Sequence, residues 1–582
     1  MEPSFLSLLP PLIAIGCALI FRRVVPALLL GVALAAVVAA GFSPLGALGE
    51  AVTYLWESLK EIGHLQILAF AGLLGALLSV VSASGGSLGV ARAATRFANT
   101  RRGGQLVSWL LGIVFFFDDY ANALFVGSTM RPITDRLRIS REKLAFIIDT
   151  TSAPVASLGP ISTWIVVEIG YIADQCRTLG VQADAYAVFI KTIPSRFYPV
   201  VMLVLGLFVA WSGRDFGPMA AAERRTSAGG PTGAPKAAAG KAEPPDFRDA
   251  QSAPGGRSWT LAAVPVAVVL VAVLAGLYVS GTAGVDAERE RLNADRSAAL
   301  QQARQAETEG DDAARARALE RARASEQQLS RNDYSPTNVL GNADSSLTIL
   351  WASFLGGLLA IFMAVTGRAL TLSSALRAWI KGGAGMIPVM AILLLAWSLG
   401  LACERLGTAA YLVGLLGPGF EAGLLPAAVF LVAATISFAT GTSWGTMGLM
   451  FPLAVPLAVT LAPGNETLFL ASISSILAGA VFGDHCSPVS DTTILSAMAA
   501  DCDQVGHVRT QLPYAVLGAA ASVFCGALPV GLGWVSTPVG LLGSVVVALC
   551  AFTILARKAS GHGSGDGTGA PTGESGSEPA LR

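Results

Sequence analysis

Two apolar stretches of the chain hold proline and glycine beside clustered aspartates and hydroxyl side chains. A proline removes one helix hydrogen bond and clashes with the preceding turn, which leaves backbone carbonyls free. Unwound carbonyls at such breaks are how membrane carriers coordinate sodium ions and handle protons. We therefore expect each stretch to be a broken helix that binds an ion. The polar groups are Asp149, Thr150, Thr151 and Ser152 in IIDTTSAPVASLGPISTW (147–164), and Asp484, Ser487, Ser490, Asp491 and Thr492 in VFGDHCSPVSDTTILSAM (481–498).

The aspartates of these stretches are the expected sodium ligands, namely Asp149, Asp484 and Asp491. Ionisable groups inside a bilayer are costly and usually face a pathway or a partner. No lysine or arginine lies within either apolar stretch to neutralise Asp149 or Asp484. A carboxylate that binds either a proton or a sodium ion, but not both together, would exchange one for the other.

Two further polar segments interrupt apolar sequence before each predicted break. FFFDDYAN (115–122) precedes the first break, and TGTSWGT (440–446) precedes the second. Each segment should form the tip of a hairpin that reaches toward the ion site. The side chains expected to complete the site are Asp118, Asp119 and Asn122 from the first tip, and Thr442, Ser443 and Thr446 from the second.

Plainer roles exist for several of these residues. Asp118 or Asp119 could be a helix N-cap, a position that aspartate favours. Serine and threonine in membrane helices often only join neighbouring helices. Glu168 could line a cavity or lie at the membrane interface, and a lone His485–Cys486 pair is weak evidence for a metal site.

The chain as a whole has the composition of a membrane protein. It has 582 residues, of which 53% are hydrophobic and 13% are charged, with 39 basic and 39 acidic groups. Soluble domains carry about 25% charged residues, and nucleic-acid-binding proteins carry a strong basic excess. Both classes are therefore excluded. Charge-free apolar windows of about 20 residues, the length of a membrane-spanning helix, recur along the sequence.

The positions of lysine and arginine predict the orientation, because short cytoplasmic loops carry the basic excess. Residues 103–130 lie between two basic clusters but are too few for two crossings of about 20 residues each. We expect a re-entrant hairpin there. Residues 424–465, flanked by Glu421 and Glu466, should form a second hairpin with its ends outside. Two hairpins of opposite orientation predict an inverted repeat, with the N-terminus outside and the C-terminus cytoplasmic.

The predicted fold is an all-α polytopic membrane protein with about 11 transmembrane helices and two re-entrant hairpins in an inverted-topology repeat with broken helices. Residues 213–258 and 557–582 are rich in glycine and other small or polar residues, which predicts that they are disordered. The predicted parts are repeat 1 (1–212, with a hairpin at about 103–130 and a broken helix at about 144–174), a disordered cytoplasmic loop (213–258), repeat 2 (259–533, with a charged extramembrane helical insert at 281–346, a hairpin at about 424–465 and a broken helix at about 467–499), an extra transmembrane helix (534–556) and a disordered cytoplasmic tail (557–582).

Three segments carry a family resemblance: FFDDYANALFVGSTMRPITDRLRISREKLAFIIDTTSAPVAS (116–157), GTSWGTMGLMFPLA (441–454) and FGDHCSPVSDTTILSA (482–497). They resemble the NhaC-type sodium/proton antiporter family, within the ion-transporter superfamily. The resemblance implies an inverted-repeat carrier and a homodimer, with a static scaffold domain, a transport domain and an elevator-like movement. The same family also contains members that exchange organic acids or move amino acids with sodium, so the resemblance leaves the substrate open.

The function that we predict is sodium/proton antiport in the cell membrane, with Na⁺ and H⁺ as cargo and no cofactor. The alternative is a sodium- or proton-coupled carrier of a small organic acid or amino acid, because helix N-termini with hydroxyl side chains also suit a carboxylate. The pair Asp118 and Asp119 would repel an anion and favours a cation or a zwitterion. An enzyme is not expected, since the sequence contains no HExxH motif and its few histidines are dispersed.

Overall fold

The computed structural model describes residues 4–21, 23–86, 89, 98–181, 183–233, 258–335, 338–339, 342–416 and 420–561. Within these ranges every regular element is a helix, which confirms the predicted all-α class. Most of the predicted loop (234–257) and most of the predicted tail (562–582) lie outside the described residues.

The helices have the lengths that a polytopic membrane protein requires. Within the described ranges, ten helices are long and apolar enough to cross a membrane, or 11 if one bent pair counts as a single span. This agrees with the predicted number of about 11. The chain is therefore a multi-pass membrane protein.

The first half of the chain supplies one hairpin and one broken helix. Its helices are α1 (Leu9–Phe21), α2 (Val24–Ala39), α3 (Pro44–Lys60), α4 (Ile62–Ala83), α6 (Arg101–Val114), α7 (Asp119–Arg136), α8 (Arg141–Thr150), α9 (Ala153–Leu158), α10 (Thr163–Thr178), α11 (Ala185–Thr192), α12 (Phe197–Ser212) and α13 (Gly217–Ser227), with 3-10 turns η1 (Phe5–Leu8) and η2 (Ile193–Ser195).

The second half supplies the other hairpin and broken helix. Its helices are α15 (Thr260–Glu309), α16 (Asp312–Arg331), α18 (Ser345–Thr366), α19 (Leu372–Gly385), α20 (Ile387–Arg405), α21 (Thr408–Leu416), α22 (Leu425–Thr440), α23 (Ser443–Leu461), α24 (Glu466–Cys486), α25 (Asp491–Ala500), α26 (Gln504–Ala521), α27 (Leu528–Gly531) and α28 (Thr537–Gly561), with a 3-10 turn η3 (Ala422–Leu424) and a π-helical segment η4 (Ser522–Ala527).

Both predicted helix breaks are present. In the first half α8 ends at Thr150 and the short α9 follows, with Pro154 in its first turn, where proline is tolerated. The helical segment Arg141–Leu158, which ends with α9, and α10 then form an angle of 41°. In the second half α24 ends before Pro488, and α25 begins at Asp491.

A helical hairpin precedes each break. α6 and α7 turn at residues 115–118, and α22 and α23 turn at Gly441 and Thr442. The two arms of the second hairpin, 422–440 and 443–461, have 19 residues each and are apolar. Each arm is therefore long enough for a full crossing, so length alone does not require re-entry at the second hairpin. The first hairpin is shorter, because α6 has only 14 residues.

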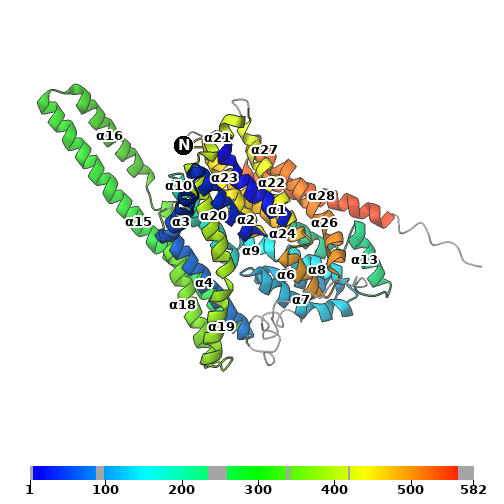
Figure 1. The fold of residues 1–582 in the computed structure, drawn as a ribbon. Coiled ribbons are helices and arrows are strands. Elements are labelled where there is room, and N and C mark those ends of the chain that lie inside the picture. The colour runs from blue at the N-terminus through cyan, green and yellow to red at the C-terminus, as the bar shows by residue number, and fades with distance from the viewer. Residues whose placement is uncertain are drawn as a thin grey trace, which may run out of the picture.

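The charged insert forms a long helical hairpin that projects from the bundle (Figure 1). α15 has 50 residues, or about 75 Å at 1.5 Å per residue, whereas the hydrocarbon core of a bilayer is about 30 Å thick. Its first part is apolar and packs with α18 and α4. Its charged part packs against α16, and small side chains such as Ala299 and Ala318 are buried there.

The start of the predicted disordered loop is ordered. Residues 217–227 form α13, in which Met219 and Ala222 are buried. Glu223 of this helix accepts a hydrogen bond from Arg101 at 2.6 Å and another from the Ser140 amide at 2.7 Å. Composition alone did not indicate these partners, which lie about 80 to 120 residues earlier in the chain.

Candidate ion-binding site

Asp484 lies in the last turn of α24, and its surroundings are mainly hydroxyl groups. Its carboxylate oxygen Oδ1 accepts a hydrogen bond from Ser490 Oγ at 2.6 Å. Ser490 Oγ lies 3.0 Å from Thr492 Oγ1, and Thr493 Oγ1 donates to the Asp484 carbonyl at 3.1 Å. Asp484 is 4% exposed. The break between α24 and α25 thus gathers one carboxylate and several neutral oxygens.

The tip of the second hairpin packs directly on this break. Gly441 has φ = 69°, and a Cβ atom there would lie 2.5 Å from the Val489 carbonyl oxygen. Ser487 Oγ donates to the Phe438 carbonyl at 2.6 Å, which joins the break to α22. Only glycine provides both the left-handed backbone and the close approach.

The hydroxyl side chains predicted at this tip have the following positions. Thr442 caps α23, because its Oγ1 accepts from the Gly445 amide at 3.4 Å. Thr446 Oγ1 donates to the Thr442 carbonyl at 2.7 Å. Ser443 is buried in the first turn of α23. These three residues therefore form the N-terminus of α23, beside the second break.

Asn122 ties the first hairpin to the first break. Its Nδ2 donates to the carbonyl of Gly112 at 2.6 Å and to that of Thr151 at 2.7 Å. Ser152 Oγ donates to the Asp149 carbonyl at 2.9 Å. Asn122 thus satisfies a carbonyl that the end of α8 leaves free, while its own buried Oδ1 has no hydrogen-bond partner within the described structure.

Asp149 has two nitrogen donors that the sequence did not reveal. Its Oδ2 lies 3.0 Å from His507 Nε2 and accepts from Gln511 Nε2 at 2.8 Å. Both partners are on α26, and Asp149 and His507 are 0% exposed. The absence of lysine and arginine from the surrounding sequence therefore gave no sign of this partner, because the histidine lies 358 residues further along the chain.

Thr150 and His485 connect the two breaks. Thr150 Oγ1 lies 3.2 Å from His485 Nε2, and Tyr198 OH lies 2.7 Å from His485 Nδ1. All three side chains are buried. His485 therefore joins the end of α8, the end of α24 and α12 by hydrogen bonds. Its ring nitrogens are used in this network.

The two halves also meet through aromatic residues near the hairpin tips. Trp164 Nε1 donates to Asp119 Oδ2 at 2.9 Å. The ring of Trp164 contacts that of Trp444 edge to face, with 6.3 Å between ring centroids. Tyr120 OH donates to Asp491 Oδ2 at 3.4 Å. Tyr120, which follows Asp119 in the chain, thereby links the first hairpin tip to the start of α25 in the opposite half.

Four helix N-termini lie where these aromatic residues join the two halves, a place that we call the meeting point. α7, α10, α23 and α25 begin after Asp118, Ser162, Thr442 and Ser490, respectively. Asp118 Oδ1 accepts from the Ala121 amide at 2.7 Å, which confirms the N-cap alternative for this residue. Helix N-termini carry partial positive charge and stabilise nearby anions. Here the chain's own carboxylates, Asp118, Asp119 and Asp491, occupy these positions.

The predicted sodium ligands do not form one cluster of acidic side chains. Among the described residues, no three His, Cys, Asp or Glu side chains are placed to hold one metal ion together. An ion bound at Asp484 would therefore take its other ligands from hydroxyl and carbonyl oxygens. Such oxygens are the ligands that hard cations prefer.

Glu168 lies in the interior of the helix bundle. It is fully buried and pairs with Arg196, whose Nη1 donates to Glu168 Oε2 at 2.6 Å. Arg196 precedes α12 by one residue and is also fully buried. Sequence reasoning missed this arginine because no local pattern links it to residue 168.

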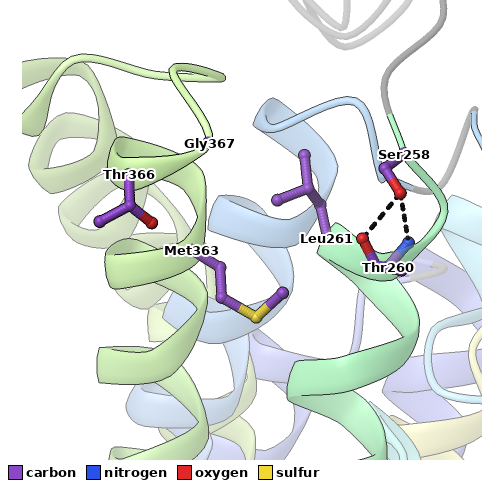
Figure 2. A pocket seen from close by; sticks show the side chains of 6 residues that line it. All are labelled: Ser258, Thr260, Leu261, Met363, Thr366 and Gly367. Carbon is purple, nitrogen blue, oxygen red and sulfur yellow. Dashed lines mark hydrogen bonds between the residues drawn. The ribbon is translucent and has the colours of Figure 1, made fainter.

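A surface pocket lies away from these residues. Figure 2 shows it between the start of α15 and the end of α18. Its volume is about 340 Å³. It contains no predicted site residue. Its lining residues are Ser258, Thr260, Leu261, Met363, Thr366 and Gly367.

Comparison with known families gives one match that covers more than half of the chain. The model of the Na+/H+ antiporter family matches residues 155–288 and 339–528. The chain belongs to the Na+/H+ antiporter family. It is therefore a secondary transporter, which confirms the resemblance found in the sequence motifs.

Three similar proteins are known, and two of them are named as antiporters. An uncharacterized protein of Haemophilus influenzae is 29% identical over 561 residues, which covers 95% of each chain. An uncharacterized Na(+)/H(+) antiporter of Haemophilus influenzae is 37% identical over 103 residues, or 17% of this chain and 21% of that protein. The malate-2H(+)/Na(+)-lactate antiporter of Bacillus subtilis is 36% identical over 85 residues, or 15% of this chain and 17% of that protein.

Proposed function

We propose that this protein exchanges sodium ions for protons at the aspartates of its two broken helices. The observation that carries this proposal is the setting of Asp484. Its carboxylate is almost fully buried, accepts a hydrogen bond from Ser490, and has no lysine or arginine as an ion-pair partner within the described structure. A charge in this position needs a counter-ion, because an isolated buried carboxylate is costly.

A proton and a sodium ion can each supply that counter-charge. Binding of one excludes the other at a single carboxylate, which couples the two fluxes. The hydroxyl groups of Ser490 and Thr492 lie beside Asp484 and would complete a sodium shell. Oxygen ligands of this type suit a hard cation.

The remaining predicted residues take supporting roles in this proposal. Asp149 and Asp491 are further carboxylates for sodium, and Asp119 supplies negative charge from the first hairpin tip. The remaining polar residues would fix the helix breaks and hairpin tips or add neutral oxygens, namely Asp118, Asn122, Thr150, Thr151, Ser152, Thr442, Ser443, Thr446 and Ser487.

The electrostatics of the meeting point favour a cationic cargo. The positive ends of α7 and α25 already face Asp118, Asp119 and Asp491. An anionic solute at the same place would meet these carboxylates and be repelled. Sodium and protons are cargo in this account, and no cofactor is proposed.

A second candidate function is coupled transport of a small organic acid. The Bacillus subtilis relative is named for malate and lactate exchange, and it matches 15% of this chain at 36% identity. The N-termini of α10 and α23, with Ser443 in the first turn of α23, offer amide and hydroxyl donors that suit a carboxylate. In this alternative sodium or protons would drive solute movement.

Reconstitution in proteoliposomes separates the two candidates. A pH dye inside the vesicles reports proton movement when sodium, lithium or potassium is added, alone or with a panel of carboxylates and amino acids. Sodium alone should drive proton movement above that of empty vesicles. Proton movement that requires an organic solute would overturn the proposal and support the second candidate.

The wider arrangement also belongs to this proposal. We place the protein in the cell membrane as a homodimer, with its N-terminus outside and its C-terminus in the cytoplasm. The short basic clusters around residues 92–102 and 131–143 support this orientation.

A further inference from the structure

A buried arginine spans the bend between α9 and α10. Arg196 Nη1 donates to the carbonyl of Ser157, in the last turn of α9, and to Glu168 Oε2 on α10 at 2.6 Å. Its Nε and Nη2 donate to Thr192 Oγ1 at 3.1 and 2.9 Å. One guanidinium therefore holds a backbone carbonyl before the bend and a side chain after it.

This ion pair is a costly way to stabilise a fold. Both side chains are 0% exposed, and removing two charges from water often costs more free energy than their attraction returns. Well-packed apolar residues are often equal or better for stability alone. Stability alone therefore does not account for this pair, and the positions of the groups that it holds are informative about its role.

The geometry connects the pair to the candidate site through α10. Glu168 lies one helical turn after Trp164, whose Nε1 donates to Asp119 Oδ2 at 2.9 Å. The helical segment Arg141–Leu158, which ends with α9, and α10 differ by 41° in direction. Fixing Glu168 relative to Ser157 therefore fixes where Trp164 meets Asp119.

The second half of the chain contains a similar device. Gln511 Nε2 donates to the carbonyl of His485, in the last turn of α24, and to Asp149 Oδ2. Gln511 lies two residues before Pro513, and Arg196 lies three residues before Pro199. In both halves a planar donor side chain near a proline holds a freed carbonyl at the break.

We propose that Arg196 is a positioning residue: paired with Glu168, it clamps the bend between α9 and α10 so that Trp164 holds Asp119 in the ion-binding geometry. The inference rests on the proposed sodium/proton exchange for its functional readout. Arg196 itself does not contact Asp119, so its effect on transport passes through α10 and Trp164.

The test compares two buried ion pairs that are replaced in the same way. The clamp variant carries Arg196→Met and Glu168→Met together, because a single replacement would leave one uncompensated buried charge. The matched control carries Lys143→Met and Asp215→Met, a pair with 0% and 6% side-chain exposure that lies away from the first bend. A third variant, Trp164→Phe, removes the hydrogen bond to Asp119.

The functional readout is the KM for sodium and the turnover number per folded protein in proteoliposomes. We expect the clamp variant and Trp164→Phe each to raise the KM for sodium about tenfold, which is the effect expected from the loss of one hydrogen bond to a charged group. The variant that combines all three replacements should show no further increase in KM, because both changes disrupt the same contact. The control should keep the wild-type KM. A purely structural role for Arg196 would lower yield and leave KM unchanged.

A second readout does not depend on transport. Hydrogen exchange of backbone amides at residues 157–165 should become faster in the clamp variant than in the wild type and the control. Unchanged hydrogen exchange would overturn the clamp. Faster hydrogen exchange together with a wild-type KM for sodium would overturn the positioning role of Arg196. Absence of sodium-driven proton movement in the wild type would instead overturn the proposed function, and hydrogen exchange would still decide whether the clamp exists.

Discussion

Asp484 and Asp149 occupy contrasting settings although both lie at helix breaks. Asp484 has hydroxyl neighbours, Ser490 and Thr492, whereas Asp149 is held by His507 and Gln511. The sequence predicted both aspartates because each stands beside proline in apolar sequence. It did not predict His507 or Gln511, since a helix such as α26 gives no local sign of a partner more than 350 residues away.

The two adjacent aspartates of the first hairpin tip should differ in their effect on transport. Asp118 caps α7, and asparagine is an equally good N-cap, so Asp118→Asn should keep most of the exchange activity. Asp119→Asn should weaken sodium binding by about tenfold or more, because it removes the charge held by Trp164. The measurement is the KM for sodium of both variants. Equal losses would show that the Asp118 carboxylate also contacts the cargo.

At the scale of elements, the breaks and hairpins follow from glycine and proline. Pro488 separates α24 from α25, and Gly441 ends α22 with a left-handed backbone. Their positions along the sequence were sufficient to predict these features. The contact between Gly441 and Val489 was not predictable, because it depends on how α22 packs against α24.

The close contact between Gly441 and Val489 leads to a prediction about stability. Gly441→Ala should lower the melting temperature in detergent, because the new Cβ would clash with the Val489 carbonyl and typical overpacking costs about 1–3 kcal/mol. Gly464→Ala is the matched control, since Gly464 also has a positive φ, at 77°, but has no atom within 4 Å of the new Cβ. Equal destabilisation by both changes would mean that backbone strain alone, and not the contact, limits this position.

At the scale of the whole molecule, composition and charge-free windows predicted a helical membrane protein of about 11 spans, which the helices confirm. The composition of residues 213–258 was less informative, because α13 forms from small residues that tertiary ion pairs hold in place. The inverted repeat is supported by matching hairpins and breaks in the two halves. The membrane orientation of each half remains a prediction.

Cysteine labelling tests this orientation. In a background without the exposed Cys550, Phe420→Cys and Glu466→Cys should react with an impermeant thiol reagent added outside intact cells. Arg136→Cys, between the first hairpin and its break, should react only after the cells are permeabilised. Labelling of positions 420 and 466 from the cytoplasmic side would contradict the inverted repeat.

The central claim is that Asp484 carries the exchanged ions, and sodium-driven proton movement by Asp484→Asn tests it most directly. Wild type, Asp484→Asn and Asp503→Asn would be reconstituted at equal protein per vesicle. Asp503 caps α26 outside the site, and asparagine keeps such a cap. We predict normal exchange for wild type and Asp503→Asn, and no exchange above empty vesicles for Asp484→Asn. Exchange by Asp484→Asn at the wild-type rate would contradict the account.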